Sequence, residues 1–256
     1  MSNSTANILG IRVHSVTMNE ALEILDGMAA ARRGGQIVTV NPEFIMEALV
    51  NPTFRRVLNR ATLAVPDGTG IVWAARILGT RMRERVTGVD LLQNFPLIAA
   101  RKGYRLFLLG AAPGVAEKAA SILQERHPGL VIAGTFSGSP RKEDEEEIRT
   151  KILAAAPDLL FVAYGSPQQE LWIERNAPGL RLPVCIGVGG AFDFTADVVP
   201  RAPAVMQKLG IEWLFRLWQQ PSRWRRMMVL PKFALLVIGT RFLGWNAIGN
   251  DNAEVP

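Results

Sequence analysis

Short apolar runs, separated by longer stretches of helical character, recur along most of this 256-residue chain. Several runs are almost wholly apolar, as in Arg105-Leu-Phe-Leu-Leu109. A strand that is apolar on both faces is typical of a mainly parallel sheet that lies between two layers of helices. We therefore predict an α/β fold with helices on both faces of the sheet, and strands at residues 8–13, 36–40, 63–66, 104–109, 130–133, 159–163 and 184–188.

Helical segments are expected in the gaps between these runs. The first is marked by Thr17-Met-Asn-Glu20, a capping-box spacing in which both side chains bind free backbone N–H groups at the helix start. Other helices are expected to begin near Pro113, Arg141 and Gln168.

The pattern changes after about residue 200, where we expect no further strand. Residues 201–245 hold four of the six tryptophans, eight basic residues and only one acidic residue, so this segment carries a charge of +7 and the rest of the chain −1. Nucleic acid and anionic lipid are the usual partners of such a basic patch. We predict an α/β domain over residues 1–200, a basic helical appendage over 201–245 that is interrupted near Pro221 and Pro231, and a polar tail over 246–256.

The appendage contains a seven-residue apolar stretch, residues 233–239, between Lys232 and Arg241. A helix needs roughly 20 apolar residues to span a bilayer, so this stretch is expected to lie on a membrane without crossing it. The first ten residues lack the basic start and long apolar run of a signal peptide. We therefore expect a cytoplasmic protein that is peripheral at the inner face of the cell membrane.

Polar and glycine-rich loops follow five of the predicted strands. In an open parallel sheet, ligands bind beyond the carboxyl ends of the strands, where glycines admit a phosphate and helix N-termini favour negative charge. One such loop is more often only a turn, but five on one rim predict a ligand site. The loops contain Thr39 and Asn41, Asp67-Gly-Thr-Gly70, Gly110-Ala-Ala-Pro-Gly114, Gly165-Ser-Pro-Gln-Gln169-Glu170, and Gly187-Val-Gly189-Gly190-Ala-Phe-Asp193.

Common cofactor signatures are absent from the sequence. The Gly110-Ala-Ala-Pro-Gly114 loop is not the dinucleotide fingerprint G-x-G-x-x-G, and there is no Walker A loop. His14 and His127 lack metal-ligand spacing, no D-x-D pair occurs, and the single cysteine, Cys185, lies in an apolar run. We expect no bound cofactor and no metal site.

Six motifs resemble, in order and over nearly the whole chain, those of the WecG/TagA/CpsF glycosyltransferases, glycosyltransferase family 26. They are Thr39-Val-Asn41-Pro-Glu43, Pro66-Asp67-Gly-Thr-Gly70, Arg85-Val-Thr-Gly88-Val-Asp90, Gly165-Ser-Pro-Gln-Gln169-Glu170, Gly187-Val-Gly-Gly-Ala-Phe-Asp193, and Arg201-Ala-Pro203 followed by Glu212-Trp213-Leu-Phe-Arg216.

The resemblance implies a Rossmann-like core and an inverting, metal-independent transfer of a sugar from a UDP-sugar to an undecaprenyl-diphosphate-linked acceptor. The sugar would be of the N-acetylmannosamine type, glucose or a uronic acid. The product would be a precursor of teichoic acid, enterobacterial antigen or exopolysaccharide. Expected partners are the UDP-sugar, the lipid-linked acceptor and an anionic membrane surface, with no nucleic acid; a homo-oligomer is left open.

The resemblance also carries roles onto single residues. Asp67 matches the catalytic base, and Thr39, Asn41, Arg85 and Gln169 match the lining of the sugar and acceptor site. Residues expected at the nucleotide are Gly110, Gly165, Gly187, Gly189, Gly190 and Asp193. The family's C-terminal arginines, for UDP or the lipid diphosphate, are matched by Arg216, Arg223 and Arg226.

Each of these roles has a plainer alternative. An aspartate with its ordinary pKa of about 3.9 is a weak base for a hydroxyl, so Asp67 must act late in the reaction or have its pKa raised by burial. Alternatively, Asp67 caps a helix that starts near Thr69, and Asp193 is a cap or a fold support. Arg223 and Arg226, three residues apart, share a helix face that is either a ligand site or merely solvated.

Two other classes of function remain as alternatives. One is a non-catalytic protein that binds RNA or anionic lipid through its basic segment, although no RRM or KH signature is present. The other is a sugar-nucleotide epimerase, which the missing dinucleotide fingerprint disfavours.

Overall fold

The structure is a computed structural model, and it describes residues 4–180, 184–203, 205–206, 211–219, 221 and 224–245, except for the side chain of Arg216. The predicted tail at residues 246–256 and Arg223 therefore lie outside the described residues.

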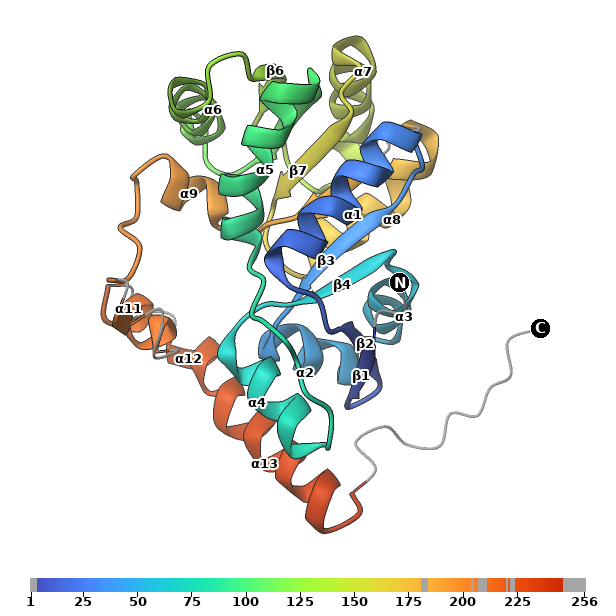
Figure 1. The fold of residues 1–256 in the computed structure, drawn as a ribbon, viewed down its shortest axis with the longest axis vertical. Coiled ribbons are helices and arrows are strands. Elements are labelled where there is room, and N and C mark those ends of the chain that lie inside the picture. Colours follow the sequence, from blue (N-terminus) through green and yellow to red (C-terminus); the bar gives the residue numbers. More distant parts are fainter. Residues whose placement is uncertain are drawn as a thin grey trace, which may run out of the picture.

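A six-stranded parallel sheet forms the centre of the protein, with strand order β4-β3-β8-β7-β5-β6 (Figure 1). The strands are β3 (Gln36–Val40), β4 (Leu63–Pro66), β5 (Arg105–Gly110), β6 (Val131–Phe136), β7 (Leu159–Ala163) and β8 (Val184–Gly187). Every residue of β3, β4, β7 and β8 is buried, because both faces of the sheet are covered. The predicted α/β class with a mainly parallel, Rossmann-like sheet is confirmed.

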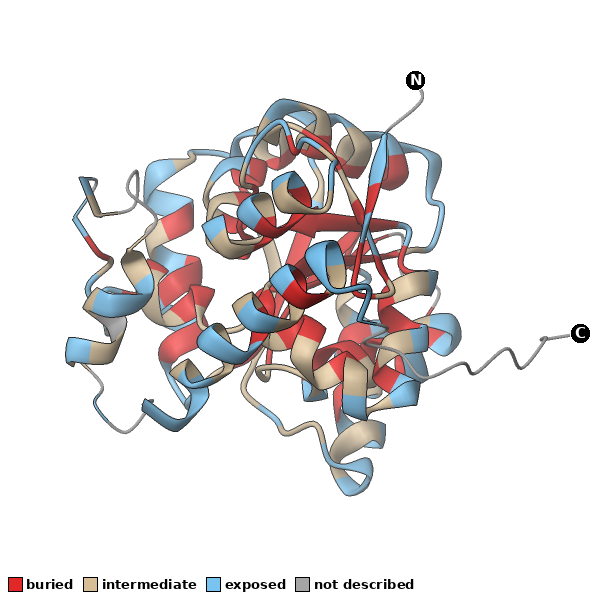
Figure 2. Cartoon of the chain, turned by 90° about the horizontal axis from the view of Figure 1, so that it is seen from below, coloured by how far each residue is buried: buried red, intermediate tan, exposed pale blue. Residues whose placement is uncertain are grey.

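Helices cover both faces of the sheet, and buried residues, red in Figure 2, run through the sheet and the helix sides that face it. One face packs against α1 (Met18–Ala31), α5 (Gly88–Lys102), α6 (Val115–Arg126) and α9 (Ala191–Thr195). The other face packs against α2 (Pro42–Val50), α3 (Pro52–Arg60), α4 (Thr69–Ile77), α7 (Glu145–Ala155), α8 (Gln168–Leu180) and α13 (Val229–Phe242). Alternation of side chains along a strand produces this division: Ile37 faces the first layer, and Val38 faces the second.

The N-terminal segment differs from the prediction of one strand at residues 8–13. It forms an antiparallel hairpin of β1 (Thr5–Ile8) and β2 (Ile11–His14). Leu9 and Gly10 both have positive φ, 48° and 85°, and make the tight turn that reverses the chain. The hairpin is joined to the main sheet by His14, whose Nδ1 accepts a 3.0 Å hydrogen bond from the Ala64 N–H.

Most predicted helix starts are confirmed. Thr17 and Glu20 form the capping box at the start of α1, and α8 begins at Gln168. The start expected near Arg141 is a single 3-10 turn, η1 (Lys142–Asp144), which leads into α7. Strand β6 continues to Phe136, three residues beyond the predicted end.

The described part of the C-terminal segment includes α11 (Glu212–Gln219), α12 (Trp224–Met227) and α13, the orange and red helices in Figure 1. The sequence suggested a separate appendage, but α13 buries Phe233 and Val237 in the same apolar cluster as β1, β2, α2 and α4. The interruption predicted near Pro231 is present, because α12 ends at Met227 and α13 begins at Val229. Pro231 itself lies in the first turn of α13, where a backbone N–H has no helical partner. Among the described helices, none has the length and apolar character needed to cross a bilayer.

Candidate active site

A cavity of about 590 Å³ lies between the carboxyl ends of β3, β4, β7 and β8 and the C-terminal helices. Its polar side includes Thr39, Asn41, Glu43, Asp67, Arg85, Gly165, Gln169, Gly189, Gly190, Asp193, Arg201 and Glu212. Its apolar side includes Trp73, Trp213, Phe215, Leu217, Leu230, Phe233 and Ala234. The structure thus brings together side chains that are separated by almost 200 positions in the sequence.

The cavity lies beyond the carboxyl ends of the neighbouring strands β3 and β8, where ligands bind in open parallel sheets. The buried hydroxyl of Thr39 joins these strands by donating a 3.2 Å hydrogen bond to the carbonyl of Gly187.

Asp67 follows β4 directly, at the wall of the cavity. Its N–H donates a 2.8 Å hydrogen bond to the Val40 carbonyl, which continues the pairing of β3 and β4 by one step. The residue that caps α4 is Gly68, and no side chain makes a capping hydrogen bond there. The alternative that Asp67 is a helix cap is therefore wrong, and its carboxyl instead lies 3.5 Å from the N–H of Gly88 at the start of α5.

The pKa of Asp67 is raised to about 7, chiefly because burial removes water from its carboxylate. The N–H of Gly88 and the charge of Arg85 favour the ionised form and oppose this rise. The negative charges of Asp90 and Glu212 add to the rise. A carboxyl with this pKa exchanges its proton near neutral pH, as a general base must.

Asn41 lies at the end of β3 and caps α2. Its Oδ1 accepts a 3.0 Å hydrogen bond from the Phe44 N–H, and Pro42 takes the first helical position. This cap fixes the Asn41 side chain in the cavity wall, two residues beyond Thr39.

Gln169 is almost fully buried in the wall and connects two glycine loops. Its Oε1 accepts hydrogen bonds from the N–H groups of Gly165, at 3.1 Å, and Gly189, at 3.0 Å. Its Nε2 donates a 2.6 Å hydrogen bond to Glu170 Oε1. These hydrogen bonds show that Gln169 shapes the wall; a direct contact between its side chain and a sugar stays a prediction.

The predicted nucleotide-binding glycines divide into two groups. Gly165, Gly189 and Gly190 line the cavity. Gly187 does not line the cavity. It packs closely on Glu170, so that a Cβ atom would lie 2.5 Å from Oε1 of that residue. Gly110 also lies outside the wall and packs on the backbone of Ala163. For Gly110 and Gly187, close packing explains the absence of a side chain.

An alternating chain of charges crosses the cavity between the core and α11. Arg85 Nη1 lies 3.2 Å from Glu212 Oε2, and Arg201 Nε lies 3.5 Å from Glu212 Oε1. Arg201 Nη2 also lies 2.7 Å from Asp90 Oδ1. Arg201 and Glu212 had no role predicted from the sequence, although both belong to the motifs that carried the family resemblance.

Two of the remaining predicted residues have described side chains in the wall. Arg226 is paired with Glu43 of α2, at 3.1 Å from Nε to Oε2. Asp193 lines the cavity in the first turn of α9, whose capping residue is Gly190, so Asp193 is not its N-cap. The predicted roles of Arg216 and Arg223 concern side chains that the structure does not describe.

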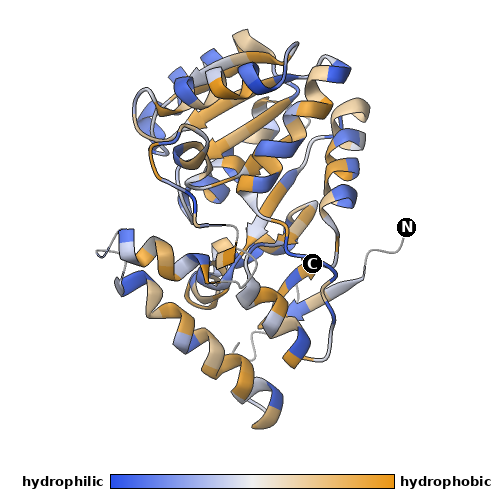
Figure 3. Ribbon diagram, turned by 60° about the vertical axis from the view of Figure 1, so that its left-hand side comes forward, coloured by the Kyte–Doolittle hydropathy of each residue, from blue (hydrophilic) through white to orange (hydrophobic). Residues whose placement is uncertain are grey.

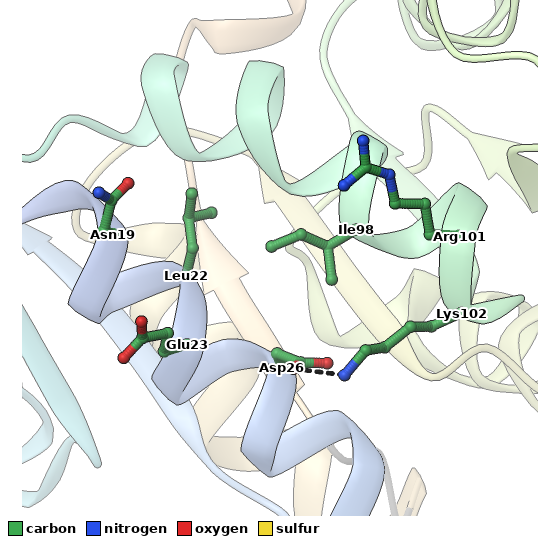
Figure 4. Close-up of a pocket in the computed structure, with 7 residues that line it drawn as sticks. All are labelled: Asn19, Leu22, Glu23, Asp26, Ile98, Arg101 and Lys102. Atoms are coloured by element: carbon green, nitrogen blue, oxygen red, sulfur yellow. Dashed lines mark hydrogen bonds and ion pairs between the residues drawn. The ribbon is translucent and has the colours of Figure 1, made fainter.

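A smaller hollow of about 320 Å³ lies between α1 and α5, where Lys102 pairs with Asp26 at 2.6 Å (Figure 4). It shares no lining residue with the Asp67 cavity. Across the described parts of the chain, no three His, Cys, Asp or Glu side chains gather as a metal site would require.

The family model described as "Glycosyl transferase WecG/TagA/CpsF family" matches residues 6–247. The chain belongs to this family of glycosyltransferases. The predicted resemblance is confirmed. The matched region contains the whole cavity and extends through α13, so the C-terminal helices are part of the family domain.

Curated relatives in this family include proteins from three bacteria, all named N-acetylglucosaminyldiphosphoundecaprenol N-acetyl-beta-D-mannosaminyltransferase. The chain is 37% identical to the protein of Bacillus spizizenii (strain ATCC 23059 / NRRL B-14472 / W23) over 206 residues, 80% of this chain and 79% of that protein. It is 36% identical to the protein of Bacillus subtilis (strain 168) over 205 residues, with the same coverage. Its identity to the protein of Staphylococcus aureus (strain MW2) is 32% over 234 residues, 91% of each chain.

Proposed function

We propose that this glycosyltransferase moves a sugar from a UDP-sugar to a sugar carried on undecaprenyl diphosphate, in the synthesis of a cell-wall polymer or exopolysaccharide. The observation that carries the proposal is the position of Asp67, a carboxyl with a pKa of about 7 in the wall of a large cavity, in the field of the Arg85 charge. The names of the relatives support a lipid-diphosphate acceptor and an N-acetylmannosaminyl donor.

The proposed reaction is a single displacement at the anomeric carbon of the donor sugar. Asp67 removes the proton from the acceptor hydroxyl while the oxygen attacks, and UDP leaves from the opposite face, so the anomeric configuration inverts. A positioned base contributes about a hundredfold or more to such a step. Arginines in the wall balance the charge on the departing diphosphate, so the proposed reaction needs no metal ion.

The two sides of the cavity suit the two ends of a lipid-linked acceptor. Glycine backbones and polar groups on the sheet side suit sugars and phosphates. The C-terminal helices contribute Phe215, Leu217, Leu230 and Ala234, which suit the first isoprene units of the lipid.

Helix α13 suits a position on the membrane surface, because it is apolar on two sides. Phe233 and Val237 are buried in the protein core, whereas Leu235, Ile238 and Phe242 form an exposed apolar face. Most of the α13 ribbon is coloured as hydrophobic in Figure 3. Lys232 and Arg241 are also exposed on this helix and would favour an anionic surface. We infer a protein that binds the membrane peripherally through α13, with the cavity close to the lipid acceptor.

An assay with a panel of UDP-sugars and a lipid-diphosphate acceptor carrying N-acetylglucosamine tests the proposal. We expect transfer from at least one donor, with an inverted anomeric configuration in the product by NMR. Asp67→Asn should lower the rate of transfer by at least about a hundredfold. Glu117→Gln, which changes an exposed acid at the start of α6, should leave it unchanged. Transfer by a folded Asp67→Asn protein at the normal rate would overturn the role of the base. Failure of the wild-type protein to transfer from any donor would favour a non-catalytic lipid-binding protein.

A further inference from the structure

The carboxylate of Glu212 lies between two guanidinium groups in the cavity wall. Arg85 reaches it from the loop before α5, at 3.2 Å, and Arg201 reaches it from the segment after α9, at 3.5 Å. Glu212 itself comes from the first turn of α11. The three side chains are only about one-fifth to one-quarter exposed, so water screens their charges incompletely.

Arg201 is not fully engaged by this arrangement. Its Nη2 is held by Asp90 at 2.7 Å, which orients the guanidinium plane. Its Nε is buried and has no hydrogen-bond partner among the described residues, because the contact with Glu212 is an ion pair at 3.5 Å. A buried N–H without a partner is energetically costly, and a better acceptor in the cavity would satisfy it.

A diphosphate is a stronger partner than a carboxylate for two arginines. Each guanidinium presents donors in a rigid fork that matches the oxygens of a phosphate group. Glu212 supplies one negative charge, whereas a diphosphate supplies more charge and more acceptor oxygens. Arg226 is less suitable for this task, because its side chain is about half exposed and already paired with Glu43.

We propose that Arg85 and Arg201 form the diphosphate subsite of the cavity, and that Glu212 occupies this subsite until a diphosphate displaces it. The inference rests on the proposed function, because both proposed substrates carry a diphosphate group. It assigns a binding role to Arg201 and a competing role to Glu212, and it couples diphosphate binding to release of α11 from the core.

Direct binding measurements test this arrangement, because it predicts which substitutions tighten diphosphate binding and which weaken it. Calorimetry with UDP, inorganic diphosphate and farnesyl diphosphate should show tighter binding to Glu212→Gln than to the wild type, by about fivefold, the scale of one partly exposed ion pair. Arg201→Met should weaken binding by at least about tenfold, the scale of a lost charged hydrogen bond. UDP and farnesyl diphosphate separate the donor from the acceptor: tightening for one of them assigns the subsite to that substrate, and tightening for both makes it shared.

The surface ion pair between Glu145 and Arg175, at 2.6 Å, supplies matched controls. Glu145→Gln and Arg175→Met make the same chemical changes outside the cavity and should leave binding unchanged. If Glu212→Gln does not fold, Glu212→Asp retains the charge with a shorter reach and should also tighten binding.

The possible failures are distinguishable. Weaker or unchanged binding by a folded Glu212→Gln or Glu212→Asp protein overturns the inference, as does unchanged binding by Arg201→Met. If the wild-type protein binds neither UDP nor farnesyl diphosphate, the proposed function itself fails.

Discussion

The amide of Gln169 donates a 2.6 Å hydrogen bond to the carboxyl of Glu170, the next residue in the chain. This bond fixes the orientation of the amide, so that its oxygen faces the N–H groups of Gly165 and Gly189. Glu170 is fully buried, and its second oxygen has no hydrogen-bond partner in the part of the chain that the structure describes. A buried acid therefore lies directly behind the two glycine loops of the cavity.

The first prediction concerns pH and stability. Burial raises the pKa of Glu170 to about 8 from an ordinary value of 4.5. Between these two values the unfolded chain releases the proton while the folded protein keeps it, so the free energy of unfolding should fall as the pH rises from 4.5 to 8. One group contributes at most about 1.4 kcal/mol per pH unit.

Glu170→Gln should flatten this dependence, since glutamine stays neutral and can still accept the hydrogen bond from Gln169. Urea unfolding at pH 5, 6.5 and 8 measures the slope, with Glu145→Gln as a surface control. Because the pKa of Asp67 is also raised, part of the slope should remain in Glu170→Gln and disappear in the double variant with Asp67→Asn. Equal slopes in the wild type and Glu170→Gln would show that Glu170 does not retain its proton.

The second prediction concerns the proposed base. Asp67→Asn should keep the fold and UDP binding but lower turnover by at least about a hundredfold, the scale of losing a positioned base. Since the ionised carboxylate accepts the proton, wild-type kcat/KM should fall as the pH falls through about 7, the pKa of Asp67. Fixed-time transfer assays between pH 5.5 and 8.5 measure this fall in kcat/KM. A kcat/KM that stays constant down to pH 5.5 contradicts the role of Asp67 as the base.

The third prediction is that UDP binds in the presence of EDTA. Arg85 and Arg201 in the cavity wall can balance the charge of the diphosphate without a cation. Calorimetry with and without EDTA should give the same affinity. Loss of affinity in EDTA that magnesium or manganese restores would reveal a metal-dependent enzyme.

The sequence predicted the sheet well because the signal for a fully covered strand is local. Residues 36–40, 63–66 and 159–163 are strands with the predicted bounds. The hairpin was missed because Leu9 must adopt a positive φ, which leucine rarely does, so the turn has only Gly10 as a marker.

The sequence did not predict the ion pairs of the site, because they join residues that only the three-dimensional fold brings together. Arg85 and Glu212 are 127 positions apart, and no spacing rule joins them. The same limit applies to α13, whose apolar residues lie on more than one side of the helix. Periodicity could not show that Phe233 and Val237 pack against the core while Leu235 faces outward.

The last prediction separates the two faces of α13. A separate appendage at residues 201–245, as predicted from the sequence, would imply that residues 201–256 can be removed without loss of the core. The structure argues against that experiment, because deletion would remove Phe233 and Val237 from the apolar cluster of β1, β2, α2 and α4. Phe233→Ala alone should cost about 3–5 kcal/mol of stability, the usual range for a buried phenylalanine. Substitutions on the exposed face avoid this cost.

The triple variant Leu235→Ser, Ile238→Ser and Phe242→Ser should remain folded but no longer sediment with phosphatidylglycerol vesicles. These side chains supply the exposed apolar face, and nearby basic groups add only about 1 kcal/mol each at an anionic surface. Wild-type binding should also weaken in high salt, because salt screens that attraction. A control triple with similar exposure elsewhere, Leu97→Ser, Val131→Ser and Leu153→Ser, should bind like the wild type. If the α13 triple variant still sediments with the vesicles, the membrane contact lies on another surface and α13 serves only to close the cavity.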